Sequence, residues 1–164
     1  MSLPVKNING DTVRLVEDLL DTMYAAPGVG LAAPQVGALA RIIVLDLDHE
    51  NPRKDNYRLI NPIITHSEGK VVWEEGCLSV VDFTAEVHRA AQVKVVAFDE
   101  NQKEINIEAD GLLAVALQHE IDHLDGKLFI DRISRLKRDL YTRRRKKMLR
   151  SGIVPPAESP RVMI

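Results

Sequence analysis

The sequence lacks the features that mark secreted and membrane-spanning proteins. It has no run of about 18 or more apolar residues, and its N-terminus has no charged region followed by an apolar one. It has one cysteine, Cys77, which excludes an internal disulfide. In a reducing compartment, a lone thiol is buried, reactive or bound to a metal. We therefore expect a cytoplasmic protein with no membrane partner.

The chain also lacks internal repeats and any segment with the composition of a domain linker. Its 164 residues, of which 45% are hydrophobic, suit one domain with a core of ordinary size. We predict a single domain over residues 1–150 and a proline-containing tail over residues 151–164 that is extended or disordered.

Positive charge is concentrated near the C-terminus. Residues 132–150 hold ten Lys or Arg against one acid, Asp139, a net charge of +9, so the rest of the chain sums to −11 within a total of −2. Such a block is more often a solvated helix face than a binding site. However, the run Arg143–Lys147 exceeds what solubility needs, and a patch of this kind attracts phosphate backbones. Both interpretations stay open at this point.

Hydrophobic periodicity predicts a helix near each end of the chain and one between them. Asp11 can cap a helix over residues 12–25. A helix over Leu112–Leu124 is apolar on most sides, so we expect it to be buried, with Gly126 as its C-terminal cap. A last, amphipathic helix starts from Ser134 and carries the basic residues. Its apolar stripe consists of Ile133, Leu136 and Leu140.

Strands are predicted between the first two helices. Gln92–Asp99 and Glu104–Ala109 read as a hairpin joined across residues 100–103. The other predicted strands are Arg41–Leu47, Tyr57–Thr65 and Lys70–Glu75. This order predicts an α+β fold, in which antiparallel and mixed β-sheets surround a central helix and further helices lie at the N- and C-terminal ends.

The segment Gln118–Gly126 contains two histidines one helical turn apart. On a helix, His119 and His123 project from one face and can converge on one ion, while Glu120 lies about 100° around the axis. Imidazoles are good ligands for zinc or ferrous iron, and the carboxylate can reach metal-bound water. Ordinary core residues of these types would cost desolvation at the end of an apolar helix. The pattern therefore predicts a catalytic metal site.

A catalytic metal site usually needs a third protein ligand. Zinc proteases with this motif take a downstream His or Glu, but no histidine follows His123 and the only later glutamate is Glu158. Cys77 follows a predicted strand, is flanked by Gly76, and would lose its proton readily beside a divalent cation. A single cysteine is more often a small buried hydrophobe, but together with the histidine pair we favour a metal ligand.

A third segment, Gly28–Gln35, contains two glycines and is not followed by the lysine of a phosphate-binding loop. Its ordinary interpretation is a turn. The functional alternative is a loop whose backbone closely approaches a substrate, with the Gln35 amide donating toward developing negative charge.

In this order, GVGLAAPQ (Gly28–Gln35), EGCLS (Glu75–Ser79) and QHEIDHLDG (Gln118–Gly126) resemble the signature segments of peptide deformylases. These enzymes remove the formyl group from the N-terminal methionine of new bacterial polypeptides. The resemblance extends from about residue 11 to residue 150. It implies that residues 1–150 form the catalytic domain and that the central helix bears the metal-binding histidines inside surrounding sheets.

The resemblance also implies the site residues. Glu120 handles protons, and Gln35 together with the backbone N–H of Leu78 forms an oxyanion site. One divalent ion is bound, Fe²⁺ in the native enzyme and Zn²⁺ or Ni²⁺ as replacements. The implied metal ligands are Cys77, His119 and His123.

The implied substrate is an N-formylmethionyl peptide. Its backbone would contact Gly30 and Gly76, and its methionine side chain would enter an apolar pocket. The residues implied for that pocket are Val29, Trp73, Leu112, Val115 and Ala116. Each of these also has a plain interpretation as a core residue. In some family members the basic C-terminal helix contacts the ribosome, which suggests a ribosome or rRNA contact for residues 132–150.

Two departures from the family pattern support an alternative, a divergent paralogue with weak activity or an altered substrate. Val81–Asp82 and Thr84 stand where the family has other residues, and family members carry a further segment before the first helix. Another alternative is a ribosome- or RNA-associated module with a structural or vestigial metal site. A structural site would have four protein ligands, and no fourth Cys or His is placed for it. A peptidase is a third alternative, against which the missing downstream ligand argues.

Overall fold

The computed structural model describes residues 1–26, 28–48 and 50–152. The predicted tail over residues 151–164 therefore lies almost entirely outside the described residues. The helices are α1 (Gly10–Ala25), α2 (Gly111–Leu124) and α3 (Arg135–Arg150). The strands are β1 (Gly30–Ala32), β2 (Ile42–Leu45), β3 (Tyr57–Glu68), β4 (Val71–Cys77), β5 (Val80–Arg89), β6 (Gln92–Phe98) and β7 (Glu104–Asp110).

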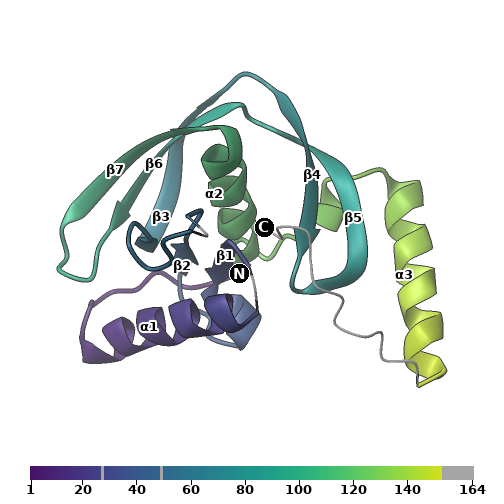
Figure 1. Cartoon of the computed structure of the whole chain (residues 1–164), viewed down its shortest axis with the longest axis horizontal. Coiled ribbons are helices and arrows are strands. Elements are labelled where there is room, and N and C mark those ends of the chain that lie inside the picture. The colour runs from purple at the N-terminus through teal and green to yellow at the C-terminus, as the bar shows by residue number, and fades with distance from the viewer. Residues whose placement is uncertain (27, 49, 153–164) are drawn as a thin grey trace.

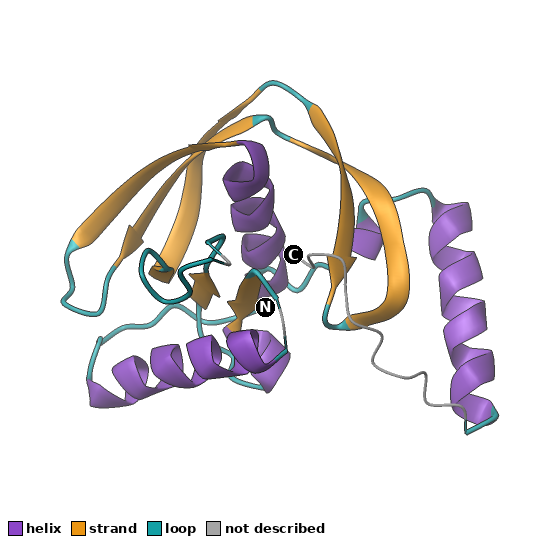
Figure 2. Ribbon diagram, viewed as in Figure 1, coloured by secondary structure: helices purple, strands orange, loops and turns teal. Residues whose placement is uncertain are grey.

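The strands form two antiparallel sheets on either side of α2 (Figure 1). One has the strand order β1-β2-β3-β6-β7, and the other is the β4–β5 hairpin. Figure 2 shows α2 between these sheets, with α1 beneath the larger sheet and α3 beyond the hairpin. The predicted α+β fold with a central helix is confirmed. Among the described strands all pairings are antiparallel, and the parallel pairing is the isolated bridge between Leu3 and Ala40.

Helix α1 begins earlier than we predicted. Its N-cap is Asn9, not Asp11, because the Asn9 side chain accepts hydrogen bonds from the backbone N–H groups of Asp11 and Thr12 at 3.0 and 3.1 Å. Both residues can cap a helix, and the sequence alone gave no reason to prefer the earlier one. The buried face of α1 packs on β1 and β2. Its buried apolar residues are Val16, Leu19, Leu20 and Met23.

Helix α2 is buried over most of its surface, as its composition predicted. Its apolar residues pack into the core formed with the larger sheet. Gly126 follows the helix with a φ of +73°, a left-handed conformation that favours glycine, so the predicted C-terminal cap is confirmed. The last turn of α2 lies beside the end of β4, where Cys77 is in contact with His123.

Strand β5 was missed in the sequence because a charged residue occupies one of its inward positions. Along Val80–Arg89, Ala85, Val87 and Arg89 are buried and the residues between them are exposed. Buried and exposed residues therefore alternate as in a strand, but the last buried position is Arg89 and not an apolar residue, so the hydrophobic pattern is incomplete. The predicted hairpin of β6 and β7 is confirmed by an unbroken register from Gln92 with Asp110 to Phe98 with Glu104.

Helix α3 begins after the N-cap Ser134, as predicted, but its expected apolar stripe is not buried. Ile133 packs against a small cluster around Phe129, whereas Leu136 and Leu140 are 70% and 57% exposed. The ring of Tyr141 makes the contact instead, with its centroid 4.8 Å from that of Phe83 on β5. No helix in the described part of the chain is both long enough and apolar enough to cross a membrane.

Candidate metal centre and active site

The structure brings together the three predicted metal ligands. Cys77 ends β4, and His119 and His123 lie on consecutive turns of α2. Their potential ligand atoms all lie within 4.8 Å of one another, and all three residues are buried. Sγ of Cys77 is 3.2 Å from Nε2 of His123, and the two imidazole centroids are 4.9 Å apart. This group could hold one metal ion.

Two of these ligands are held in their neutral forms by burial. Burial raises the pKa of the Cys77 thiol to about 12. Burial, together with the neighbouring His119, lowers the pKa of His123 to about 3. A divalent cation supplies the countercharge that a buried thiolate needs, and it binds the neutral imidazole. One sulfur and two nitrogens form a donor set suited to Zn²⁺, Fe²⁺ or Ni²⁺.

The orientation of His119 supports this fit. Nδ1 of His119 lies 2.8 Å from Oε2 of Glu75. Burial acts to raise the pKa of Glu75, but hydrogen bonds from Arg89 and His119 outweigh burial and lower it. Glu75 is therefore ionised and can only accept, so Nδ1 of His119 donates, and in a neutral imidazole with this tautomer Nε2 is the atom with the lone pair. Nε2 is buried and has no hydrogen-bond partner among the described residues, a situation that a metal ion would resolve.

The sequence interpretation missed Glu75 and Arg89. Both side chains are fully buried, and Arg89 donates to both carboxylate oxygens of Glu75 at 2.6 and 2.8 Å. Histidine ligands commonly donate their second N–H to a carboxylate, which fixes the ring orientation. The sequence offered one signal, the acid Glu75 two residues before Cys77. Its partner Arg89 could be found only once β4 was known to pair with β5.

Glu120 lies beside the candidate ligands and is 1% exposed. Burial, together with the charge of Glu75, raises the pKa of Glu120 to about 8. Its Oε2 has no partner among the described residues. A Cβ atom added at Gly30 would lie 2.5 Å from Oε1 of Glu120. The close approach that we predicted for this glycine loop is therefore made, in this structure, to the carboxylate of Glu120.

Gln35 also faces the site. Its Oε1 accepts from the backbone N–H of Ala32 at 2.8 Å, which leaves the NH₂ group pointing the other way. That NH₂ group donates to Oγ of Ser79 at 3.1 Å and lies 3.8 Å from Sγ of Cys77. Leu78 lies in the turn between β4 and β5, and its side chain lies against Gly28. The first and second signature segments therefore meet at the candidate ligands.

The residues predicted for an apolar pocket lie in one cluster. Val29, Val115 and Ala116 are fully buried in the core around α2, and Trp73 and Leu112 are partly buried against it. Gly76 is buried next to Cys77. A pocket reaches the site from the surface. Its lining residues are Pro34, Gln35, Ser79, His123, Gly126, Lys127 and Leu128.

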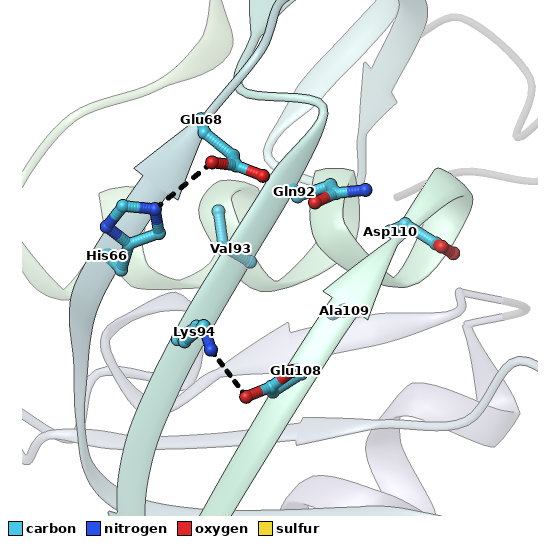
Figure 3. A pocket seen from close by; sticks show the side chains of 8 residues that line it. All are labelled: His66, Glu68, Gln92, Val93, Lys94, Glu108, Ala109 and Asp110. Atoms are coloured by element: carbon cyan, nitrogen blue, oxygen red, sulfur yellow. Dashed lines mark hydrogen bonds and ion pairs between the residues drawn. The ribbon is translucent and has the colours of Figure 1, made fainter.

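Another depression lies on the outer face of the larger sheet, on β3, β6 and β7 (Figure 3). Four of its polar side chains form two pairs: Lys94 with Glu108 at 2.6 Å, and His66 with Glu68 at 3.4 Å. It contains none of the candidate ligands, and these pairs are typical of a solvated sheet surface.

Comparison with known proteins gives consistent matches. The family model described as polypeptide deformylase matches residues 1–139. Peptide deformylase of Thermodesulfovibrio yellowstonii is 54% identical over 140 residues, which are 85% of this chain and 85% of that protein. The Rhizobium meliloti peptide deformylase is 52% identical over 145 residues, 88% of this chain and 83% of that one. The crystal structure of a peptide deformylase from Legionella pneumophila has a TM-score of 0.85 at 43% identity, covering 94% of this chain and 90% of that chain.

Proposed function

This chain belongs to the polypeptide deformylase family, and on that premise we propose how its residues remove the N-formyl group from formylmethionyl peptides. The protein is an enzyme, a hydrolase of a metal-dependent family that acts on formylated nascent peptides. One observation carries the proposed residue roles: three segments far apart in sequence place a thiol, two imidazoles, a carboxylate and an amide around one buried point. Family membership favours this enzyme over an RNA-binding module with a vestigial metal site.

The metal site is proposed to consist of Cys77, His119 and His123 holding one divalent cation. Fe²⁺ is the proposed native ion, and Zn²⁺ or Ni²⁺ would fit the same donor set. When bound, the cation supplies Lewis acidity, which activates water and polarises the formyl carbonyl. Glu75 keeps the His119 ring in the orientation that presents Nε2 to the site.

Glu120 is the proposed general base and acid. Its carboxylate accepts a proton as the oxygen of water attacks the formyl carbon, and it then delivers that proton to the departing amine nitrogen as the C–N bond breaks. Formate and a free N-terminus are released. Burial raises the pKa of Glu120 to about 8, so this carboxylate binds a proton more readily than an exposed one, which suits a group that takes a proton from water.

Gln35 and Leu78 are the proposed oxyanion donors. The NH₂ group of Gln35 already faces the ligands because Ala32 and Ser79 fix both ends of its amide. The backbone N–H of Leu78 is the second donor. Donors of this kind are each worth about 3 kcal/mol of transition-state stabilisation.

The formylmethionyl substrate is proposed to lie along the backbone of Gly30 and Gly76, with its methionine side chain in the apolar cluster beside α2. The supporting observation is that the apolar residues share one cluster along α2, the helix that carries His119 and His123. The proposed pocket residues are Val29, Trp73, Leu112, Val115 and Ala116.

Formate release from formyl-Met-Ala-Ser tests these roles. Glu120→Gln is expected to lower kcat by about 10²- to 10⁴-fold while the protein keeps its metal, because only the proton transfer is removed. Cys77→Asp retains an anionic ligand but replaces sulfur by oxygen, and it is expected to change metal affinity as well as rate. Equal formate release by wild type and Glu120→Gln would rule out the proposed role of Glu120.

We further propose that residues 1–150 form one catalytic domain, that the enzyme is cytoplasmic, and that α3 contacts ribosomal RNA. Helix α3 lies at the edge of the molecule beyond β5 (Figure 1) and has no buried residue, which leaves its basic residues accessible to a polyanion. Ribosome binding should weaken steeply as salt rises. Replacing Arg143, Arg144 and Lys147 by glutamate should abolish that binding without changing formate release from a free tripeptide, and unchanged ribosome binding would contradict the proposed contact.

A further inference from the structure

A chain of charged side chains connects the candidate ligand His119 to the base of α3. From His119 it passes through Glu75, Arg89 and Asp122 to Arg132, which precedes α3. The side chains of Glu75 and Arg89 are fully buried, and that of Asp122 is 7% exposed. The chain reaches solvent only at Arg132, whose side chain is 38% exposed.

Every link of this chain is a charge-assisted hydrogen bond. Arg89 uses two nitrogens for Glu75 and donates with Nη1 to Oδ2 of Asp122 at 2.5 Å. Arg132 donates with Nε to Oδ2 of Asp122 and with Nη2 to Oδ1 at 2.5 Å. Asp122 therefore receives hydrogen bonds from two guanidinium groups, of which Arg132 supplies the forked pair.

The charges in the chain alternate and sum to zero, two acids against two arginines. Without Arg132, the buried group keeps a net negative charge, and Asp122 retains only its bond from Arg89. A buried carboxylate that loses its partner binds the remaining cation more strongly. Arg89 would then be drawn toward Asp122 and away from Glu75, and Glu75 is the group that fixes the His119 ring.

The same segment of chain also supports the face of the His119 ring. Phe129, three residues before Arg132, lies nearly parallel to His119 at a centroid distance of 6.3 Å. Phe83 also stacks with Phe129, at a centroid distance of 6.0 Å, and Tyr141 of α3 contacts Phe83. The segment that leads into α3 therefore contacts the face of the His119 ring through Phe129, and it is linked to the Nδ1 edge of that ring through Arg132.

We propose that Arg132 is a positioning residue for the metal centre, acting through Asp122, Arg89 and Glu75 to hold His119 in its ligand orientation. The inference rests on the proposed metal role of His119, which Arg132 does not touch. On this proposal, the segment between α2 and α3 contributes to the reaction as well as connecting the two helices.

Co²⁺ is a suitable probe, because its visible absorption reports ligand geometry and its affinity can be measured by competition with a chelator, independently of activity. Arg132→Met is expected to weaken Co²⁺ binding by about threefold to tenfold, less than the 10–100-fold typical of a residue that contacts the ligand itself. Its absorption bands should shift. Arg132→Lys, which keeps one donor for Asp122, should recover most of both effects.

Arg41→Met is the matched control. Arg41 pairs with Asp125 at 2.8 Å on the same end of α2, but among the described residues that pair has no path of side-chain hydrogen bonds to His119. Both variants remove an arginine from an aspartate at this end of the helix. Only Arg132→Met should change the Co²⁺ affinity and spectrum, whereas both should lower the urea midpoint.

A double-mutant cycle with Glu75→Gln tests the path itself. If Arg132 acts through Glu75, adding Arg132→Met to Glu75→Gln should change Co²⁺ affinity by less than about twofold. Full additivity, or an Arg132→Met affinity equal to that of Arg41→Met, would overturn the proposal while leaving wild-type formate release intact. Failure of the proposed function would appear separately, as absence of formate release by the wild-type protein loaded with Fe²⁺ or Ni²⁺.

Discussion

At the scale of single residues, the site depends on what is absent as well as on what is present. Gly30 has no side chain where the carboxylate of Glu120 lies, so the glycine segment and the histidine helix can approach closely. Gln35, in contrast, contributes a polar side chain, and hydrogen bonds with Ala32 and Ser79 fix the orientation of its amide group. The sequence predicted that these residues belong to one site, but it could not predict that Gly30 approaches Glu120, because that distance depends on how β1 packs on α2.

Gly30→Ala should displace the Glu120 carboxylate. Because the added Cβ would lie 2.5 Å from Oε1, the carboxylate must move, and a shift of about 1 Å can lower kcat by about 100-fold. Metal content should not change. Steady-state formate release and metal analysis check this, with Gly10→Ala as control, since a Cβ there meets only Nη1 of Arg14 at 3.7 Å. An active Gly30→Ala protein would contradict the close contact.

Gln35→Met should lower kcat by about 10²- to 10³-fold with a small effect on KM, because an oxyanion donor acts mainly on the transition state. Ser79→Ala is the control, since it removes the Ser79 hydroxyl that accepts from Gln35 but leaves the amide in place. The kinetic constants for formyl-Met-Ala-Ser decide the matter. A Gln35→Met change confined to KM would assign the amide to substrate binding instead.

At the scale of elements, the regular patterns were predicted and the irregular ones were not. Helix α2 was predicted well because its composition leaves no polar face, whereas β5 was missed because Arg89 points inward to Glu75 and Asp122. The stripe of α3 was predicted from periodicity, yet a stripe is buried only if the body of the protein lies opposite it. Here Tyr141 makes that contact and Leu140 does not.

Tyr141→Ala should therefore loosen α3. Loss of the ring contact with Phe83 is expected to reduce the free energy of unfolding by about 1–2 kcal/mol and to make trypsin cleave α3 faster, because the helix opens more easily. Leu140→Ala, one residue away and exposed, should change stability by less than about 0.5 kcal/mol. Urea unfolding and limited proteolysis measure both. Equal stability of the two variants would show that α3 is not held by this aromatic contact.

The carboxylate of Asp46 stabilises the loop between β2 and β3, and the size of this stabilisation depends on pH. Burial acts to raise the pKa of Asp46, but hydrogen bonds from the Tyr24 hydroxyl and the Arg53 and Asp48 amides outweigh burial and lower it. A lowered folded-state pKa means that this stability is present above the unfolded value of about 3.9 and is lost as pH falls through the folded value.

Asp46→Asn should therefore be less stable than wild type at pH 7, and the difference should shrink as the pH falls below about 4. Urea unfolding of both proteins at pH 7 and at about pH 3 measures this. A difference that is the same at both values would show that the ionised form of Asp46 does not stabilise the loop.

At the scale of the whole molecule, three short segments meet because two sheets enclose one helix. The order of the segments identified the family, and the α+β class followed from the order of elements. The residue types of Cys77, His119 and His123 predicted that they share a metal ion. The way in which they come together could not be predicted, because it depends on pairings between strands distant in sequence. The exposure of α3, which has no buried residue, gave no signal in the sequence, since a basic amphipathic helix has the same pattern whether its apolar stripe is buried or exposed.

Metal binding should stabilise the entire fold, because the three ligands join β4 to α2. At a free Zn²⁺ concentration 100-fold above Kd, the expected gain is about 2.7 kcal/mol, provided that the ion does not bind the unfolded chain. Thermal unfolding with Zn²⁺ and with a chelator measures it. Cys77→Ser should lose most of the gain, and a gain equal to that of wild type would exclude the thiol as a ligand.

The central claim is that one sulfur and two imidazole nitrogens of this chain hold one divalent ion. X-ray absorption spectroscopy of the protein loaded with one equivalent of Zn²⁺ tests it most directly. The account predicts one sulfur at about 2.3 Å and nitrogen or oxygen neighbours at about 2.0–2.1 Å, including two imidazoles. A first coordination shell without sulfur, or one in which a single imidazole accounts for the outer scattering, would contradict it.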